Sequence, residues 1–291
     1  RIVATYAPSN PINPCYNSYE GEYEDYKLLI SCMPSTDDGS SHYISNFTTT
    51  GASVNINNSS GGSDSGYQDF YNSSFSLNAM AGTTINYTMT VAGGSTYGRA
   101  IWVDWNENGV FEASEQVASS SSYESSPLTG SFTIPAGTSL GAKRMRVVAT
   151  YAPSNPINPC YNSYEGEYED YKFIVIENPC DNITAMSCGV TYNATLYPNS
   201  GAWTNYTGAS YSWPGSEKVW AFTAPTTGSY TFNLNEGSAD ADFFLMSACD
   251  PNSTNLSNGY WYGGTETVTL TGGVTYYLIA DLFSSSASTT V

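Results

Sequence analysis

The sequence predicts an all-β protein made of tandem β-sandwich domains of the jelly-roll type. Its composition is rich in Tyr (25) and Gly (26), with many Ser, Thr and Asn and few Lys and Leu. Tyr, Thr and Val suit a pleated, half-buried surface, whereas the shortage of Leu and Lys weakens helix formation. Short runs of alternating apolar and polar residues, separated by Asn, Gly, Ser and Pro clusters, are typical of a sandwich. The length of 291 residues allows two domains of about 150 residues.

The alternation places the strands in order along the chain. A Ser-rich loop over residues 119–126 interrupts the first set, and a domain boundary is expected at residues 177–180, after Ile176. The two sets are therefore assigned to two sandwiches. The expected strands cover residues 85–91, 100–105, 130–134 and 144–151 in the first set and 218–223, 229–234, 242–246 and 274–280 in the second.

An internal repeat defines the module boundaries. Residues 3–27 recur letter for letter as residues 148–172, 145 positions later. This period is too long for a solenoid and indicates a tandem array of domains. Residues 1–30 are then the C-terminal remnant of a preceding module, 31–177 a complete module and 178–291 a second type of sandwich. The remnant is either the place where the array is cut or a strand donated to a neighbouring subunit.

Charge and composition exclude several function classes. The formal net charge is −18, from 8 Lys and Arg against 26 Asp and Glu, and His42 is the single histidine. A surplus of acid repels nucleic acids and anionic membranes, so neither is an expected partner. One histidine leaves little room for zinc sites or His-based triads. There is no apolar run long enough to insert into a membrane, and the opening Arg1 leads directly into a strand, so we expect a piece of a longer polypeptide.

The segment after the predicted strand at 100–105 has the spacing of an EF-hand calcium loop. A hard cation needs six to eight oxygen ligands on a tightly curled backbone, and Gly109 at position 6 permits the turn. The alternative is a plain hairpin turn at Asn-Gly. The prediction is a calcium-binding loop grafted onto a sandwich. Its ligands at positions 1, 3, 5, 7, 9 and 12 would be Asp104, Asn106, Asn108, the carbonyl of Val110, Glu112 and Glu115.

Two further acidic groups are weaker calcium candidates. Glu165, Glu167 and Glu169 alternate, so a strand would place all three on one face, where they repel unless a cation or an arginine neutralises them. Direct calcium ligation and pairing with arginines at 144 and 146 remain equally open. In the second sandwich, Asp240, Asp242 and Asp281 form either another calcium site or caps for loop amides.

The cysteines favour disulfides over metal, given this composition. A bond between Cys32 and Cys160 would staple the two ends of the complete module. The competing scheme pairs Cys15 with Cys32 and Cys160 with Cys180, which would link consecutive modules. In the second sandwich one of the cysteines at 180, 188 and 249 would be left over.

No catalytic motif survives inspection. Residues 137–141 match the letters of a Gly-x-Ser-x-Gly nucleophile elbow, but a strand pattern follows instead of a helix, and the sole histidine is distant. No carboxylate pair stands out for glycoside hydrolysis. Aromatic residues in turn-rich segments either stack on sugars or pack in the core. We therefore expect no enzymatic activity. The aromatic residues are Trp203, Tyr206, Tyr211, Trp213, Tyr260, Trp261 and Tyr262.

Three separated motifs stand at residues 102–111 (WVDWNENGVF), 144–147 (RMRV) and 166–171 (GEYEDY). In this order they resemble the GEVED domain of secreted bacterial proteins, with Tyr168 where the family has Val. The resemblance spans about 31–177, with 1–30 as a remnant. Residues 178–291 are similar to the bacterial pre-peptidase C-terminal domain, at 214–222, 228–232, 239–245 and 276–281. That family's closing strand is missing after Asp281.

Together these observations predict a non-catalytic segment of a long secreted bacterial surface protein, extracellular and stabilised by calcium and disulfides. It would act as a stalk or adhesin and could assemble into a filament. Neighbouring modules or copies would be its partners, and surface glycans or host surfaces would be further ones. The alternative is an accessory, substrate- or glycan-binding region of a secreted protease or other hydrolase.

Overall fold

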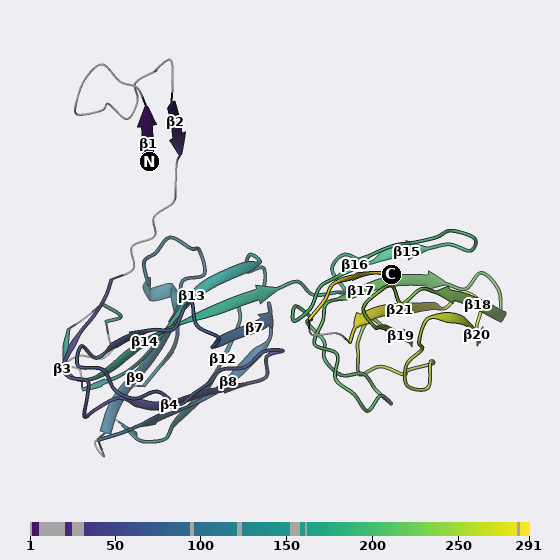
Figure 1. Ribbon diagram of the computed structural model, residues 1–291. Coiled ribbons are helices and arrows are strands. Elements are labelled where there is room, and N and C mark those ends of the chain that lie inside the picture. The colour runs from purple at the N-terminus through teal and green to yellow at the C-terminus, as the bar shows by residue number, and fades with distance from the viewer. Residues whose placement is uncertain are drawn as a thin grey trace.

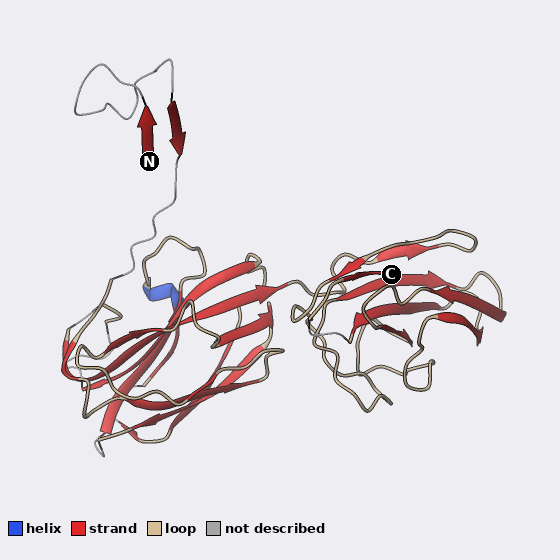
Figure 2. Ribbon diagram, in the orientation of Figure 1, coloured by secondary structure: helices blue, strands red, loops and turns tan. Residues whose placement is uncertain are grey.

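The computed structural model describes residues 2–5, 21–24, 32–93, 96–120, 124–151, 158–160, 162–283 and 286–291. Within these ranges almost every regular element is a strand, as Figures 1 and 2 show. A single turn of 3₁₀-helix, η1 (Ala113–Glu115), interrupts them. The fold is therefore all-β, as the sequence predicts. No helix in the described ranges is long and apolar enough to span a bilayer.

One sheet of the first sandwich has four antiparallel strands in the order β12-β8-β4-β5. Its apolar side chains alternate inward; Ile85, Tyr87 and Met89 of β8 all lie in the core. The Asn46 side chain ties the short edge strand to β4 through the carbonyl of Asn58, 3.0 Å away. These strands are β4 (Ile44–Thr50), β5 (Asn57–Asn58), β8 (Thr84–Val91) and β12 (Leu128–Thr133).

The facing sheet has eight strands and is organised around one long strand, β14. One edge of β14 pairs antiparallel with β13, and its other edge pairs in turn with three short parallel strands, β3, β6 and β7. Strand β9 lies on the far side of β13 and also contacts β10 and β11. The strands are β3 (Thr36–Asp38), β6 (Tyr67–Asp69), β7 (Ser76–Met80), β9 (Thr96–Val103), β10 (Gln116–Ser119), β11 (Glu124–Ser125), β13 (Gly141–Tyr151) and β14 (Ser163–Ile176).

The large sheet is buried on both faces. Residues of β13 and β14 with odd numbers, such as Val147 and Phe173, enter the core between the two sheets. Residues with even numbers, such as Val148, enter a second cluster on the outer face, which the loop after β9 covers with Phe111. The motif residue Tyr168 also lies in this outer cluster and is fully buried. A tyrosine therefore replaces valine there without exposing the ring.

The first copy of the repeat forms the same hairpin as the second. Strand β1 (Ile2–Thr5) pairs antiparallel with β2 (Gly21–Glu24), with Val3 opposite Tyr23. In the complete module the equivalent residues pair identically, with Val148 opposite Tyr168. The repeated sequence thus encodes its own register. Donation of this segment to a neighbouring subunit involves a second chain and stays a prediction.

The second sandwich contains a four-stranded sheet, β15-β17-β21-β19, and two-stranded sheets β18-β20 and β16-β22. A short strand, β22, does follow Asp281, and it pairs with β16; the sequence predicted no closing strand there. The strands are β15 (Thr184–Met186), β16 (Thr195–Leu196), β17 (Glu217–Thr223), β18 (Gly228–Leu234), β19 (Ala241–Met246), β20 (Gly264–Leu270), β21 (Thr275–Leu282) and β22 (Thr289–Thr290).

The four-stranded sheet of the second sandwich is also covered on both faces. One face meets the β18-β20 sheet. The other is covered by the segment between β16 and β17, whose Trp203, Tyr206 and Trp213 pack on Phe244. Tyr206 stacks on the Phe244 ring with centroids 3.8 Å apart. Met80, from the end of β7 in the first sandwich, packs against the same cluster.

Candidate calcium loop and buried acidic clusters

The segment that follows β9 curls around its own carboxylates. Asp104 is 4% exposed, and its two oxygens accept the backbone N–H groups of Asn108 (3.1 Å) and Gly109 (2.9 Å). Glu107 and Gly109 have positive φ angles of 58° and 83°, which gives the loop its tight curl. Glycine adopts that conformation without a steric cost.

The acidic end of the loop folds back onto its start. Glu115 is buried at the end of η1, and one of its oxygens accepts the N–H groups of Trp105 (2.9 Å) and Asn106 (3.3 Å). Its other oxygen accepts the N–H of Glu112 at 3.1 Å. Burial raises the pKa of the Glu115 carboxyl. Positions 1 and 12 of the loop are thus anchored through backbone amides.

Side-chain amides hold the carboxylate of Glu112, the candidate ligand at position 9 of the loop. The Glu112 carboxylate accepts the side-chain N–H groups of Asn106 (3.2 Å) and Asn108 (3.0 Å). A carboxylate oxygen has two lone-pair sites, so an oxygen that accepts one N–H keeps one for a metal. The donor set is all oxygen, which suits calcium. However, no three Asp, Glu, His or Cys side chains within the described residues converge as a metal-holding group, so calcium ligation stays a prediction.

Glu165, Glu167 and Glu169 do share one face of β14, the inner one. Glu167 accepts the N–H of Ile44 (2.9 Å) and the side-chain amide of Gln68 (2.7 Å). Glu169 accepts hydrogen bonds from Ser60 (2.6 Å) and Tyr171 (2.8 Å). Burial raises the pKa of Glu167 to about 7, and burial together with the Glu167 charge raises that of Glu169 to about 8.

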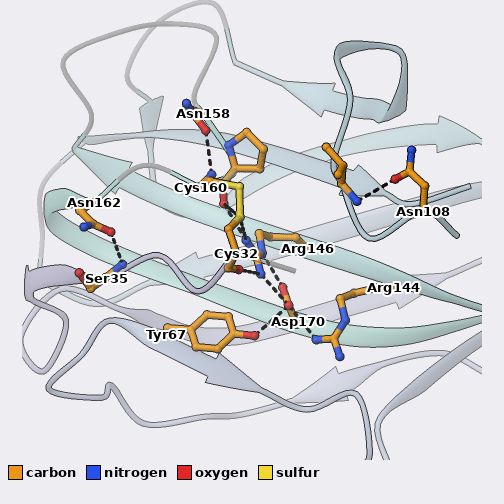
Figure 3. The surroundings of a disulfide bond; sticks show 12 residues. Cys32, Ser35, Tyr67, Asn108, Arg144, Arg146, Asn158, Cys160, Asn162 and Asp170 are labelled. Atoms are coloured by element: carbon orange, nitrogen blue, oxygen red, sulfur yellow. Dashed lines mark hydrogen bonds and ion pairs between the residues drawn. A yellow bond between two sulfur atoms is a disulfide. The ribbon is translucent and has the colours of Figure 1, made fainter. Parts of the chain in front are cut away.

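The arginines pair with Asp170, on the other face of β14. Arg146 and Asp170 are both fully buried and form a two-pronged ion pair, with Nε–Oδ1 and Nη2–Oδ2 distances of 2.6 and 2.8 Å. Asp170 also accepts from Arg144 (2.9 Å) and the Tyr67 hydroxyl (2.9 Å), as Figure 3 shows. Of the two alternatives left open, pairing with Arg144 and Arg146 is therefore not what holds Glu167 and Glu169. Side chains alternate along a strand, so Asp170 meets the arginines across the β13–β14 pair.

The Cys32–Cys160 disulfide lies directly over this ion pair (Figure 3). Arg146 donates to the carbonyls of Cys32 (2.8 Å) and Pro159 (2.7 Å), and its guanidinium lies 4.8 Å from the centre of the Phe111 ring. This is the pairing that staples the two ends of the module. Cys15 lies outside the described residues, and its expected bond to Cys32 in the competing scheme is excluded.

The second sandwich has its own disulfide, between Cys180 and Cys249. The competing bond between Cys160 and Cys180 is therefore excluded as well. Cys188 is the exposed cysteine left over. Two disulfides agree with an extracellular location.

Two of the three aspartates predicted in the second sandwich come together, and one does not. Asp242 and Asp281 are directly opposite each other on β19 and β21. Asp240 is exposed and precedes β19 in a positive-φ conformation. Glu217 on β17, which sequence reasoning missed, lies directly opposite Asp281 on its other side. Only the pairing register reveals this neighbour, because 64 residues separate it from Asp281.

Burial governs the ionisation of these three carboxyls. It raises the pKa of Glu217 to about 7 and that of Asp242 to about 6. The pKa of Asp281 is also raised, first by burial and then by the charge of Glu217.

The aromatic candidates divide between core and surface. Trp203, Tyr206 and Trp213 are buried. Tyr211 and Tyr262 are more than half exposed, and both rings contact Tyr260 edge to face. Core packing therefore accounts for the buried tryptophans, and the tyrosines form a small surface cluster.

One protein-family model matches the part of the chain that forms the centre of the large sheet. Residues 98–174 match the GEVED domain model. The match runs from β9 through the candidate calcium loop and β13 into β14, and it contains the Arg146–Asp170 pair. It covers about a quarter of the chain. No curated protein matches the chain.

Proposed function

We propose that this chain is a non-catalytic structural segment of a secreted bacterial surface protein, assembled from repeated modules. The observation that carries the proposal is the shared register of the two hairpins, β1–β2 and β13–β14. An identical sequence that pairs identically is the mark of a repeated building unit. Extracellular placement is supported by the GEVED match and the disulfides.

The repeat, together with the arginine two positions before each copy, also carries the parts of the buried ion-pair network. Arg1, Cys15 and Asp25 stand at the positions of Arg146, Cys160 and Asp170. Each module would therefore bring its own arginine, carboxylate and cysteine to clamp its ends. Neighbouring modules or copies of the chain are the proposed partners.

Calcium is the proposed ligand of the loop that follows β9. The residues that would hold it are Asp104, Asn106, Asn108, the Val110 carbonyl, Glu112 and Glu115, and the ion would neutralise their charge. The buried Asp104 and Glu115 are already turned inward by backbone amides. Because the unfolded chain lacks this arrangement, binding would stabilise the folded module by mass action.

We propose that the chain is not catalytic because its buried acidic residues already bond to other groups of the fold. Glu167, Glu169 and Asp170 are buried and engaged in hydrogen bonds or ion pairs within the fold. Such groups hold strands together and do not face a substrate.

Thermal unfolding with and without calcium tests the proposal. Calcium at 100 times its dissociation constant should stabilise the first sandwich by about 2.7 kcal/mol relative to chelator. Asp104→Ala should abolish this response. Asp64→Asn, which changes an exposed carboxylate of the same module, should keep it. An unchanged calcium response in Asp104→Ala would refute the loop assignment.

An accessory binding role is the second candidate. It is favoured by the exposed ring cluster of Tyr211, Tyr260 and Tyr262 on a sandwich that resembles pre-peptidase C-terminal domains. Flat rings stack on sugar faces. A glycan array should then show binding that Tyr262→Ala weakens and Tyr197→Ala, at another exposed tyrosine, does not.

A further inference from the structure

Three carboxylates form a row across the sheet of the second sandwich. Asp281 on the central strand β21 lies opposite Glu217 of β17 on one side and Asp242 of β19 on the other. All three occupy the face that the β16–β17 segment covers, the face of Val219, Ile279 and Phe244. Side chains directly opposite in an antiparallel pair are close neighbours, and like charges there repel.

Two oxygens of this row lack a hydrogen-bond partner. Asp281 is fully buried and Asp242 is 3% exposed. One oxygen of Asp281 accepts the Tyr206 hydroxyl at 2.5 Å, and one oxygen of Asp242 accepts the Trp213 indole N–H at 2.8 Å. The remaining Oδ1 atom of each is buried without a partner. A buried carboxylate oxygen in that state is costly.

The second sandwich itself offers no basic side chain to neutralise the row. Lys218 is the only Lys, Arg or His in residues 178–291. It follows Glu217 directly, so it leaves the strand on the opposite face, and its ammonium donates to the carbonyl of Asn182 at 3.0 Å. Glu217 itself is held by the backbone N–H groups of Ala202 (2.9 Å) and Trp203 (3.1 Å).

We infer that Asp242 and Asp281 bind a divalent cation, Ca²⁺, between β19 and β21, with Glu217 as the adjacent negative charge. The donors are oxygens only, with no cysteine or histidine in the row, which selects a hard cation over zinc or copper. No three Asp, Glu, His or Cys side chains converge as a metal-holding group among the described residues, so these two carboxylates would be its acidic ligands. Hydroxyl, carbonyl or water oxygens would have to supply the rest of the six to eight ligands that Ca²⁺ takes.

This ion would fix the segment that covers the sheet. Tyr206 donates to Asp281 and Trp213 donates to Asp242, so the cation and the two aromatic donors would hold the same two carboxylates. Tyr211 lies between them in sequence and faces the surface cluster with Tyr260. The site therefore links metal binding to the position of the exposed tyrosines, and through Met80 to the contact with the first sandwich.

Calorimetric titration with Ca²⁺ tests the inference in the whole chain. Asp104→Ala removes the proposed loop site, so this variant should still bind one Ca²⁺. Adding Asp242→Asn or Asp281→Asn should weaken that remaining binding at least about tenfold, whereas Glu266→Gln, on β20 of the other sheet, should not. Terbium provides a second readout, because Trp213 beside Asp242 should sensitise its emission.

The outcomes separate this inference from the proposed function. An Asp104→Ala protein that binds no Ca²⁺ overturns the second site and leaves the loop intact as a proposal. Binding that survives Asp104→Ala but is lost with Asp242→Asn supports it, whatever the loop does. If Asp242→Asn stabilises the chain in chelator and wild type shows no calcium response, the row shares protons, and the inference is wrong. If the aspartate variants do not fold, terbium emission from the Asp104→Ala protein decides the matter: emission sensitised by tryptophan supports a site beside Trp213, and its absence overturns the inference.

Discussion

At the scale of single residues, Arg146 and Asp170 form a buried ion pair in which each charge meets its partner. Both are fully buried, and each prong of the guanidinium reaches an oxygen of the carboxylate. The remaining donors of Arg146 meet carbonyls beside the disulfide. Such a pair is costly to form and far more costly to break on one side.

Asp170→Asn should therefore destabilise the first sandwich by about 3–5 kcal/mol, because it leaves the Arg146 charge unpaired. Denaturant unfolding measures the change. Asp64→Asn, at an exposed position, is the matched control and should lie within about 0.5 kcal/mol of wild type. A loss below about 1 kcal/mol for Asp170→Asn would show that the pair is not buried in solution.

The pair Glu167 and Glu169 predicts a pH dependence. Their folded pKa values of about 7 and 8 lie above the ordinary carboxyl value of 4.5. The folded state therefore holds protons that the unfolded chain has released. The folding stability that these two protonated carboxyls contribute is fully present below about pH 4.5. It is lost as pH rises through 7 and 8, at about 1.4 kcal/mol per pH unit and group. Urea unfolding from pH 5 to 9 in chelator should show the decline, and Glu169→Gln should flatten it.

At the scale of elements, the motif glycine determines how β13 and β14 approach each other. Gly166 has a φ of +112°, and a Cβ there would lie 2.2 Å from the Ala149 carbonyl oxygen. Its own carbonyl accepts the Thr36 hydroxyl at 2.8 Å. The glycine thus allows both the backbone conformation and the contact with the neighbouring strand.

Gly166→Ala should cost clearly more stability than Gly141→Ala, and thermal unfolding measures both. Gly141 has a similar φ of +107° but open space around it. The backbone strain is then common to both, at about 1 kcal/mol, and the difference reports the clash with β13. Equal losses would contradict the close approach seen here.

At this scale, the local alternation of apolar and polar residues predicts where strands lie. It does not predict which strands pair when they are far apart in the sequence. The alternation in 85–91 and 130–134 corresponds to β8 and β12. The three parallel strands along β14 were not predicted, since β3, β6 and β7 are short and their partner lies far away in the sequence. The choice of Asp170 over the glutamates as arginine partner, and Glu217 as neighbour of Asp281, depend on register between strands far apart in sequence.

At the scale of the whole molecule, the two sandwiches share several features of their construction. Each sandwich has a disulfide and a segment that packs aromatic side chains on the outer face of its main sheet, Phe111 in the first and Trp203, Tyr206 and Trp213 in the second. The acidic net charge could be predicted from composition. The groups that each carboxylate contacts could be identified only from the folded structure.

Removing the Cys32–Cys160 disulfide should lower the stability of the first sandwich by about 4–5 kcal/mol, because it closes a long loop in the unfolded chain. The bond spans 128 residues of sequence. Replacement of both cysteines by serine and chemical denaturation measure the loss. Cys188→Ser, at the free exposed cysteine, should leave stability unchanged, and a similar loss there would contradict the assignment.

Anomalous diffraction from crystals grown with Ca²⁺ tests calcium binding by the loop after β9 most directly. We expect an anomalous peak surrounded by oxygens of Asp104, Asn106, Asn108 and Glu115. A well-ordered loop with no peak at saturating calcium would contradict it.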